Sequence, residues 1–357
     1  MKCPRGGTTV DLVRTTRDQA PARAGALGLL VGVVLDTALP DPRRAHPVAA
    51  FGHAASALER RLYRPSLAQG ARYAVLAVAP VVAAAALAER GGPLRRVTLT
   101  AATTWAVVGG DMLGREASGI ADALEAGDLD TARERLPRLC GRDPNELDEE
   151  GLTRATVESV AENTSDAVVA PLLWGGLLGV PGLAGYRAVN TLDAMVGHRS
   201  PRYERFGWAA ARADDVANWA PARLTAALTA LAAPTIAGDP VRAWRARSRY
   251  GPRHPSPNAG QCEAAFAGAL GVRLGGTNSY GGRAESRPEL GDGHRPEVGD
   301  IRRAVRLARV VTGAAATVAA ALATVTAPKG WSRAQRGAPA RLAGVPGQRK
   351  PRRGRAA

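Results

Sequence analysis

Cysteine is scarce in this chain, and its positions exclude two common uses of the residue. Only Cys3, Cys140 and Cys262 occur in 357 residues, and no two of them form a CxxC pair. A disulfide framework or a structural zinc site needs several cysteines or histidines at short, regular spacing. The sequence therefore indicates neither kind of site, and the three cysteines suit a reducing cytoplasmic environment.

Common signatures of nucleotide-binding and hydrolytic enzymes are also missing. A P-loop needs a lysine followed by serine or threonine, and none of Lys2, Lys329 or Lys350 is followed by either. Neither HExxH nor GxSxG occurs, which excludes the usual zinc-protease and serine-hydrolase motifs. Any ATP site in this chain must therefore be built in another way.

Basic residues outnumber acidic ones, giving a formal net charge of +16 and a pI near 11.0. Such a balance can indicate nucleic-acid binding, because clustered cations release counterions from phosphates. Here the charge is scattered through loops and concentrated after residue 328, without helix-turn-helix or zinc-finger spacing. Basic loops beside membrane segments explain it better, and we expect no nucleic-acid partner.

The apolar residues lie in long Ala, Val, Leu and Gly runs, which favour membrane-spanning helices. Of six candidate spans, the second and the last are the clearest. Others carry Asp36, Asp111 or Arg223, and a charge at the bilayer centre costs roughly 3 kcal/mol or more. Those segments are partial spans, or their charges lie near the headgroups. The candidates are residues 24–39, 71–88, 97–113, 167–185, 216–237 and 304–326.

The fourth candidate span contains Pro171 and Pro181 and is rich in glycine. This composition favours a re-entrant or interrupted helix that lines a cavity. A re-entrant hairpin would place every polar motif of the chain on one face of the membrane.

Composition predicts an all-α, polytopic membrane protein with one membrane-embedded domain over residues 24–327. Charges and leucines at helical spacing predict a soluble helical insert over residues 114–165. The polar, Gly/Pro-rich composition of residues 238–300 predicts an irregular loop. The basic leader, 1–23, and the basic tail, 328–357, have too little apolar surface to bury, and we expect both to be disordered.

Polar clusters beside the apolar runs are the candidate functional motifs. The first, DTALPDPRRAHP at residues 36–47, is also explained by a helix-ending loop with interfacial arginines. In the second, Arg154, Glu158, Glu162 and Asp166 are each four apart and share one helical face. Such carboxylates repel each other unless a cation intervenes, and oxygen ligands suit the Mg²⁺ that ATP carries. A solvated ion-pair face is the alternative.

The third cluster comprises YRAVNTLDAMVGHR at residues 186–199 and RADDVANW at residues 212–219. Asp215 and Asn218 offer hard oxygen ligands of the kind that a metal-bound phosphate needs. A helix N-cap formed by Asp214 explains part of this pattern equally well.

The fourth cluster is HPSPNAGQCE at residues 254–263, followed by GGTNSYGG at residues 275–282. The glycines would let backbone N–H groups approach an anion closely, and His254 could exchange protons near neutral pH. The competing interpretation is that these glycines and prolines simply belong to flexible loops.

Taken together and in this order, LDxxLPDPRRxHPVxxFG, ESVAENTSD and the third and fourth clusters resemble the cobinamide-phosphate synthases called CobD or CbiB. The resemblance covers residues 27–325. It implies a multi-pass protein of the cytoplasmic membrane that joins adenosylcobyric acid, through its f-propionate, to (R)-1-amino-2-propanol or its O-phosphate. The corrinoid would be a substrate, and we expect no bound prosthetic group. Other cobalamin-pathway enzymes are possible partners.

By analogy with other amide ligases, we expect ATP and Mg²⁺ to activate the carboxylate as an acyl phosphate before the amine attacks. Glu158, Glu162 and Asp166, or alternatively Asp214 and Asp215, would hold Mg²⁺. Arg199 and Arg43 would meet phosphate or propionate groups, and His254 or His46 would take the amine proton. The remaining candidates for substrate or phosphate binding are Asn163, Asn190, Asp193, His198, Asn218, Asn258, Gln261, Asn278, Tyr280, Gly281 and Gly282.

Two other functions compete with the ligase. A non-catalytic membrane signalling protein related to the AmpE family would share the scaffold, although the retained polar motifs argue against it. A transporter would explain broken spans and intramembrane charge, but it predicts inverted repeats that the sequence does not contain.

Overall fold

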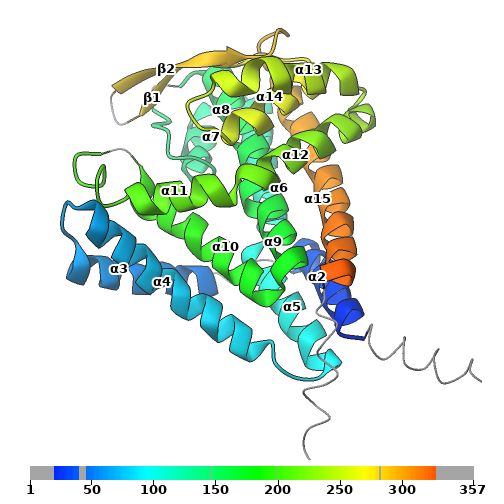
Figure 1. The fold of residues 1–357 in the computed structure, drawn as a ribbon. Helices are drawn as coiled ribbons and strands as arrows, with labels where there is room; N and C mark the ends of the chain where they lie inside the picture. The colour runs from blue at the N-terminus through cyan, green and yellow to red at the C-terminus, as the bar shows by residue number, and fades with distance from the viewer. Residues whose placement is uncertain (1–19, 40–45, 146, 199, 281–282, 327–357) are drawn as a thin grey trace, which may run out of the picture. The chain divides into compact units, whose positions relative to one another are not determined.

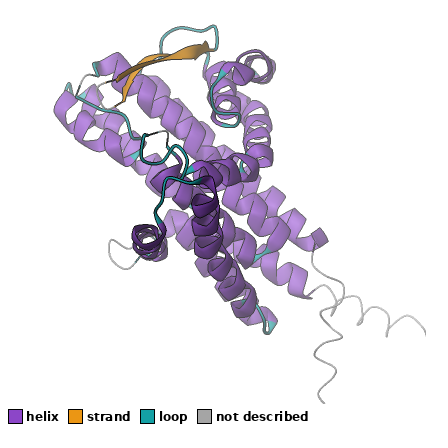
Figure 2. Ribbon diagram, turned by 60° about the vertical axis from the view of Figure 1, so that its left-hand side comes forward, coloured by secondary structure: helices purple, strands orange, loops and turns teal. Residues whose placement is uncertain are grey.

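A computed structural model gives the fold for residues 20–39, 46–145, 147–198, 200–280 and 283–326 (Figure 1). Nearly all of this part is helical, as the sequence predicts, and two strands form one hairpin (Figure 2). The predicted disorder of the leader and the tail concerns residues outside the described part, apart from the end of the leader. That end is helical, because the helix α2 begins at Ala20.

Two described helices, α4 (Leu67–Ala88) and α15 (Val298–Thr326), are long and apolar enough to cross a membrane. They correspond to the two predicted spans with the clearest sequence signal. Both keep apolar side chains exposed, including Val75, Leu76 and Val310. A helix in the core of a soluble protein would bury such side chains, so their exposure agrees with lipid contact.

The other predicted spans are shorter or interrupted. The first corresponds to α2 (Ala20–Ala38), and the third is only partly covered by α5 (Pro93–Val107). The fifth is divided between α11 (Trp208–Ala217) and α12 (Trp219–Ala232), followed by the 3₁₀ turn η4 (Ala233–Ile236). A break before α12 suits Pro221, because a proline in the first turn of a helix loses no hydrogen bond.

The fourth predicted span is a helical hairpin formed by α9 (Ala170–Leu178) and α10 (Val180–Leu192). The chain turns at Gly179, whose φ of 69° is a conformation that favours glycine. The two helices pack along each other, and Gly182 leaves room for the carbonyl of Trp174. The hairpin brings the segments before and after it to the same end, and a re-entrant path through a membrane stays a prediction.

The predicted insert is helical, and α8 (Glu149–Thr164) is its longest buried part. It departs from the amphipathic expectation, because α6 (Gly110–Glu125), α14 (Ala259–Leu270) and α15 pack around it and bury most of its residues. A buried helix that carries several carboxylates needs a reason for them. The other elements of the insert are α6 (Gly110–Glu125), α7 (Leu129–Arg135) and the 3₁₀ turn η1 (Leu136–Arg138).

The segment predicted as an irregular polar loop, residues 238–300, instead folds into helices and the hairpin. Every residue of α14 is buried, so its sequence lacks the polar face that would reveal a surface helix. The strands pair antiparallel beside α13 and α14, at one end of the described helices (Figures 1 and 2). The remaining elements are α13 (Pro240–Tyr250), the 3₁₀ turn η5 (Gly251–Arg253), β1 (Leu274–Tyr280) and β2 (Arg283–Leu290).

A second, smaller core lies apart from the main one, where α3 (Pro47–Leu62) and α4 meet α10 and α11. Phe206 is fully buried there, between the rings of Tyr63 and Tyr73. These contacts fix the chain between α10 and α11, which carries part of the third polar motif.

Candidate active site

The acidic ladder of α8 continues into a π-helical turn, η2 (Ser165–Val169). Glu158 and Glu162 lie on α8, and Asp166 lies on the π turn. A second π turn, η3 (Asp193–Gly197), ends α10 and begins at another acidic residue. Such turns are rare and are found mostly at functional sites. Both lie at the same end of the α9–α10 hairpin.

Carboxylates from the second and third motifs lie close enough to raise one another's pKa. The pKa of Asp166 is well above its usual value, first because of burial and then because of Asp214, Glu162 and Asp193. Burial likewise raises the pKa of Glu162, although Arg287 and Arg142 oppose the shift. We call Glu162, Asp166, Asp193 and Asp214 the acidic centre.

Asp214 is held by two side-chain amides. Asn218 Nδ2 donates to its Oδ2 (2.9 Å) and Asn190 Nδ2 donates to its Oδ1 (3.3 Å). Tyr186 Oη donates to Asn218 Oδ1 (2.8 Å) and lies 3.1 Å from the carbonyl oxygen of Asp166, which ties α11 to the π turn. Burial raises the pKa of Asp214, and the two amide hydrogen bonds limit the rise. The geometry explains why both asparagines lie in the motifs.

Asp193 has the most informative titration in the acidic centre. Burial, followed by the charges of Asp214, Asp215 and Glu162, raises its pKa from 3.8 to about 7. A carboxyl group with that pKa can hold or release a proton near neutral pH.

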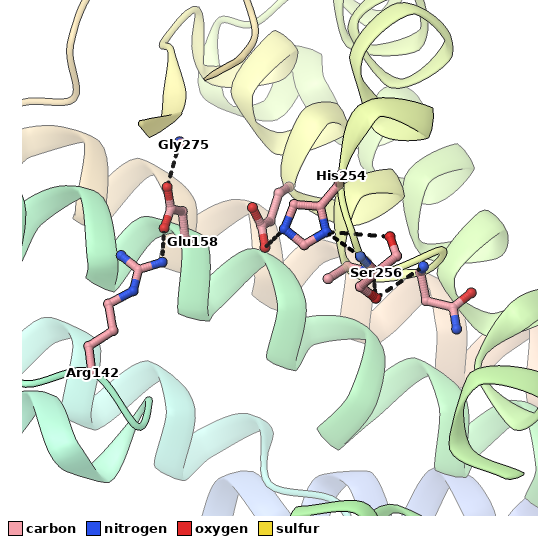
Figure 3. Close-up of polar contacts among 8 residues, drawn as sticks. Arg142, Glu158, His254, Ser256 and Gly275 are labelled. Carbon is pink, nitrogen blue, oxygen red and sulfur yellow. Dashed lines mark hydrogen bonds and ion pairs between the residues drawn. The ribbon is translucent and has the colours of Figure 1, made fainter. Parts of the chain in front are cut away.

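Glu158 has a different environment from the acidic centre (Figure 3). Its Oε1 accepts a hydrogen bond from Gly275 N (2.6 Å), and its Oε2 pairs with Arg142, which is also buried. Both oxygens therefore bind the protein itself, joining α8 to β1 and to the loop that carries Arg142. The predicted metal role of Glu158 stays a prediction, although these contacts favour a role in positioning.

His254 and Glu263 form a buried pair beside Glu158 (Figure 3). Nε2 of His254 lies 3.9 Å from Glu263 Oε1, while its Nδ1 accepts from Ser256 N (3.1 Å). The accepting Nδ1 assigns the proton of the neutral ring to Nε2, directed at the carboxylate. Burial, then Glu158 and Glu162, raise the pKa of Glu263 well above its usual value. At 3.9 Å the two groups interact electrostatically, and a shorter separation would be needed for proton exchange between them.

Asn258 connects the fourth motif to the third. Its Nδ2 donates to the carbonyl of Asp215 (2.8 Å), and its Oδ1 accepts from Arg223 Nη1 (3.3 Å). Arg223 in turn lies over the ring of Trp219, 4.4 Å from its centroid. The side chain of Asp215 pairs with Arg212 at the surface (3.0 Å), away from the amides that hold Asp214.

Other predicted site residues have local roles in the structure. His46 caps α3 by accepting from Val48 N (3.3 Å), and Asn163 donates to Ser159 O in its own helix (3.0 Å). His198 is exposed against the ring of Tyr203. Gln261 is buried beside Gly251.

Part of the predicted site lies outside the described residues. Arg43, Arg199, Gly281 and Gly282 belong to this group, and the predictions made for them remain predictions. For Asn278 and Tyr280, the structure describes only their backbone in β1.

Within the described residues, no group of three or more His, Cys, Asp or Glu side chains is arranged to hold a metal ion. The acidic centre therefore provides no complete cage of protein ligands. Mg²⁺ usually binds one or two carboxylates together with substrate phosphates and water. The carboxylates present fit an ion of that kind, because a cation would relieve the repulsion between Asp166 and Asp214.

Sequence reasoning missed several residues of the site. Arg142 lies in a loop without periodicity, so nothing in the sequence indicated that it reaches α8. Tyr186, Arg187 and Glu263 lie within the polar motifs but were not selected as site residues. Their hydrogen-bonding groups beside the chosen asparagines were the signal that could have identified them.

Sequence similarity to known proteins shows which family this chain belongs to. The family described as CobD/Cbib protein matches residues 29–308. A cobalamin biosynthesis protein CobD of Mycobacterium tuberculosis (strain CDC 1551 / Oshkosh) is 54% identical over 301 residues, which cover 83% of this chain and 95% of the relative. Proteins of the same name from Chromobacterium violaceum and from Stutzerimonas stutzeri are 46% and 43% identical. Each match covers 79% of this chain, and they cover 91% and 92% of the relatives' own lengths. No solved structure matches the chain significantly. The chain therefore belongs to the CobD/CbiB family of cobalamin-biosynthesis proteins.

Proposed function

We propose that this protein is an adenosylcobinamide-phosphate synthase, a Mg- and ATP-dependent amide ligase. It would join the f-propionate of adenosylcobyric acid to (R)-1-amino-2-propanol or its O-phosphate. Family membership supports the pathway. The observation that carries the reaction class is the acidic centre, where burial and neighbouring carboxylates from separate motifs raise the pKa of each acidic side chain although Arg142, Arg187 and Arg287 lie nearby.

The acidic centre fits Mg²⁺ that arrives with ATP. Asp166 and Asp214 are the best candidates to hold the ion, because burial and then the charge of Asp214 raise the pKa of Asp166 and neither carboxylate forms an ion pair among the described residues. Bound ATP would supply the phosphoryl group that turns a carboxylate oxygen into a leaving group. Asn190 and Asn218 hold Asp214 in place for that purpose.

Formation of the amide would create a C–N bond and break the C–O bond of the acyl phosphate, which releases inorganic phosphate, and the amine nitrogen loses a proton. His254 is our first candidate for the acceptor: its ring is oriented by Ser256, and its Nε2 would pass its own proton to Glu263 before it accepts the amine proton. Asp193 is a second candidate, since its pKa of about 7 suits proton exchange at neutral pH. No covalent enzyme nucleophile is needed in this reaction.

We also propose that the protein is a multi-pass protein of the cell membrane. Two helices, α4 and α15, have the length and apolarity for it. Exposed apolar side chains on α2, including Leu27, Leu30 and Val34, support a lipid-facing surface there as well.

Complementation tests the proposed reaction. A bacterial strain that lacks its cobinamide-phosphate synthase would receive the wild type, Asp214→Asn or the control Asp130→Asn, and would grow only by converting cobyric acid. Asp130 has a side chain that is 92% exposed, so its variant controls for the chemical change alone. We expect growth with the wild type and the control and none with Asp214→Asn, with equal amounts of each protein in the membrane fraction.

Asp166→Asn and Asp215→Asn extend the test to the choice of carboxylates. Loss of growth with Asp166→Asn but not with Asp215→Asn would assign the ion to the acidic centre. Failure of well-expressed wild type to support growth would contradict the ligase and favour the signalling relative.

A further inference from the structure

A cavity of about 490 Å³ lies beside α8, between it and the helices α2, α6 and α15. Thr164 and Val168 belong to its wall, and each lies two residues from a carboxylate of the ladder, about 200° around the helix. The cavity and the acidic ladder therefore occupy opposite sides of the same helical segment. Its volume is in the range of small-molecule binding sites.

The interior of this cavity is apolar, because its polar groups already have partners. The hydroxyl groups of Thr37, Thr164 and Thr312 each donate to a carbonyl of their own helix. Asp36 is buried, and its Oδ2 accepts from the N–H of Asp111 (3.1 Å) at the N-terminus of α6. The apolar wall is formed by Val33, Leu113, Val160, Val168, Val305 and Ala308. Such a wall suits a hydrocarbon chain.

Arg309 supplies a cation at the rim of the cavity. Its side chain reaches across to α6, where a Cβ on Gly114 would lie 3.7 Å from its Nη2. Across the described residues, no hydrogen bond or ion pair engages this guanidinium. The nearby Asp111 is already paired with Arg115 (2.8 Å). An exposed arginine beside an apolar cavity favours an anionic headgroup.

The mouth of the cavity opens beside an apolar surface. Val34 lines the cavity and is 62% exposed, and Gly313 is exposed on the facing helix. The exposed apolar face of α2 continues from Val34 to Leu30 and Leu27. Arg309 lies immediately before the uncharged part of α15, which is where interfacial arginines lie in membrane helices.

We propose that this cavity binds a hydrocarbon chain of a membrane lipid whose phosphate group pairs with Arg309. The proposal rests on the proposed membrane location and is independent of the amide ligation. Val168 belongs to the π turn that carries Asp166. A bound chain would therefore stiffen the wall shared by the cavity and the acidic centre.

Photolabelling of the full chain, purified in an uncharged detergent, tests this proposal. The probe is an alkyl phosphate with a photoreactive diazirine in its chain, and labelled peptides are identified by mass spectrometry. We expect labels on the cavity-lining parts of α2, α6 and α15, and competition by dodecyl phosphate. Dodecanol and inorganic phosphate should compete at least about tenfold less well, because each lacks one half of the ligand. Equal competition by either, or labels confined to α4, would overturn the proposal.

Two pairs of variants on α15 localise the site. A Cβ added to Gly313 or to Gly299 meets no atom within 4 Å, so both positions have open space where a leucine side chain would begin. Gly313→Leu should block the mouth and reduce labelling about tenfold, whereas Gly299→Leu, away from the cavity, should label as the wild type does. Arg309→Gln should weaken binding of the probe about tenfold and Arg306→Gln less than twofold.

Equal labelling within either pair would contradict the site. Hydrogen exchange gives an independent readout, since dodecyl phosphate should slow exchange in residues 165–169 of the wild type but not of Gly313→Leu. Binding to the purified protein does not depend on growth, so failure here is distinguishable from failure of the proposed ligase activity.

Discussion

The second core and the acidic centre both contain enclosed carboxylates, but they treat the charge in opposite ways. In the second core, Glu59 accepts from Arg202 Nη2 (3.0 Å) and from Tyr203 Oη (2.9 Å), so its charge has a cation and a hydroxyl partner. In the acidic centre, burial and then the charges of Asp214, Glu162 and Asp193 raise the pKa of Asp166, and the opposing charge of Arg187 has a smaller effect. Burial alone therefore does not identify a functional carboxylate in this protein.

The two kinds of carboxylate differ in whether a paired arginine balances the negative charge. Glu158 lies beside the acidic centre but follows the pattern of Glu59, because Arg142 and Gly275 satisfy it. A compensated carboxylate holds elements of the fold together, whereas an uncompensated one lowers stability and is retained for another purpose. Substitutions in the two classes should therefore shift stability in opposite directions.

Glu158→Ala should have the largest effect on stability. It would break the buried ion pair with Arg142 by removing one of its members, which typically costs about 3–5 kcal/mol. We expect a marked fall in the melting temperature of the purified protein, followed by tryptophan fluorescence in detergent. The double variant Glu158→Ala/Arg142→Met should recover part of the loss, because it also removes the positive charge that Glu158 balances. A double variant no more stable than Glu158→Ala would contradict the compensation argument.

Asp166→Asn should have the opposite and smaller effect. Removing one charge from the acidic centre relieves repulsion, so the free energy of unfolding should rise by about 1 kcal/mol while ligation is lost. The measurement is the melting temperature in buffer without divalent cations, compared with that of the exposed control Asp130→Asn. A lower melting temperature for Asp166→Asn would assign Asp166 to the compensated class.

The sequence predicted which residues belong to this site better than it predicted the contacts between them. The spacing of Glu158, Glu162 and Asp166 correctly predicted one helical face, because α8 continues without a break into η2. The π turn itself was not predictable, since a single turn is too short to establish a periodicity of its own in the sequence. The separation of Glu158 from the other carboxylates was also hidden, because it depends on Arg142 from a distant loop.

The fold was predicted where apolar length decides it and missed where burial removes the pattern. The long apolar runs predicted two spans, and α4 and α15 are helices long and apolar enough to cross a membrane. By contrast, α14 is buried on every side and adjoins glycine-rich strands, so residues 238–300 were interpreted as a loop. The proline and glycine content of the α9–α10 segment did indicate its hairpin.

The smallest expected effect is a change in how stability depends on pH when Asp193 is replaced. Its pKa is raised from 3.8 to about 7, so between these values the folded protein keeps a proton that the unfolded chain has released. Stability should therefore fall as the pH rises through this window and level off above about pH 7. Asp193→Asn should remove that slope in thermal unfolding without divalent cations. Asp128→Asn is the matched control, since hydrogen bonds from Thr131 lower the pKa of Asp128 and confine its effect to more acidic solution. An unchanged slope in Asp193→Asn would contradict this prediction and would show that the charge of Asp193 in the wild type is balanced by a partner, as that of Glu59 is.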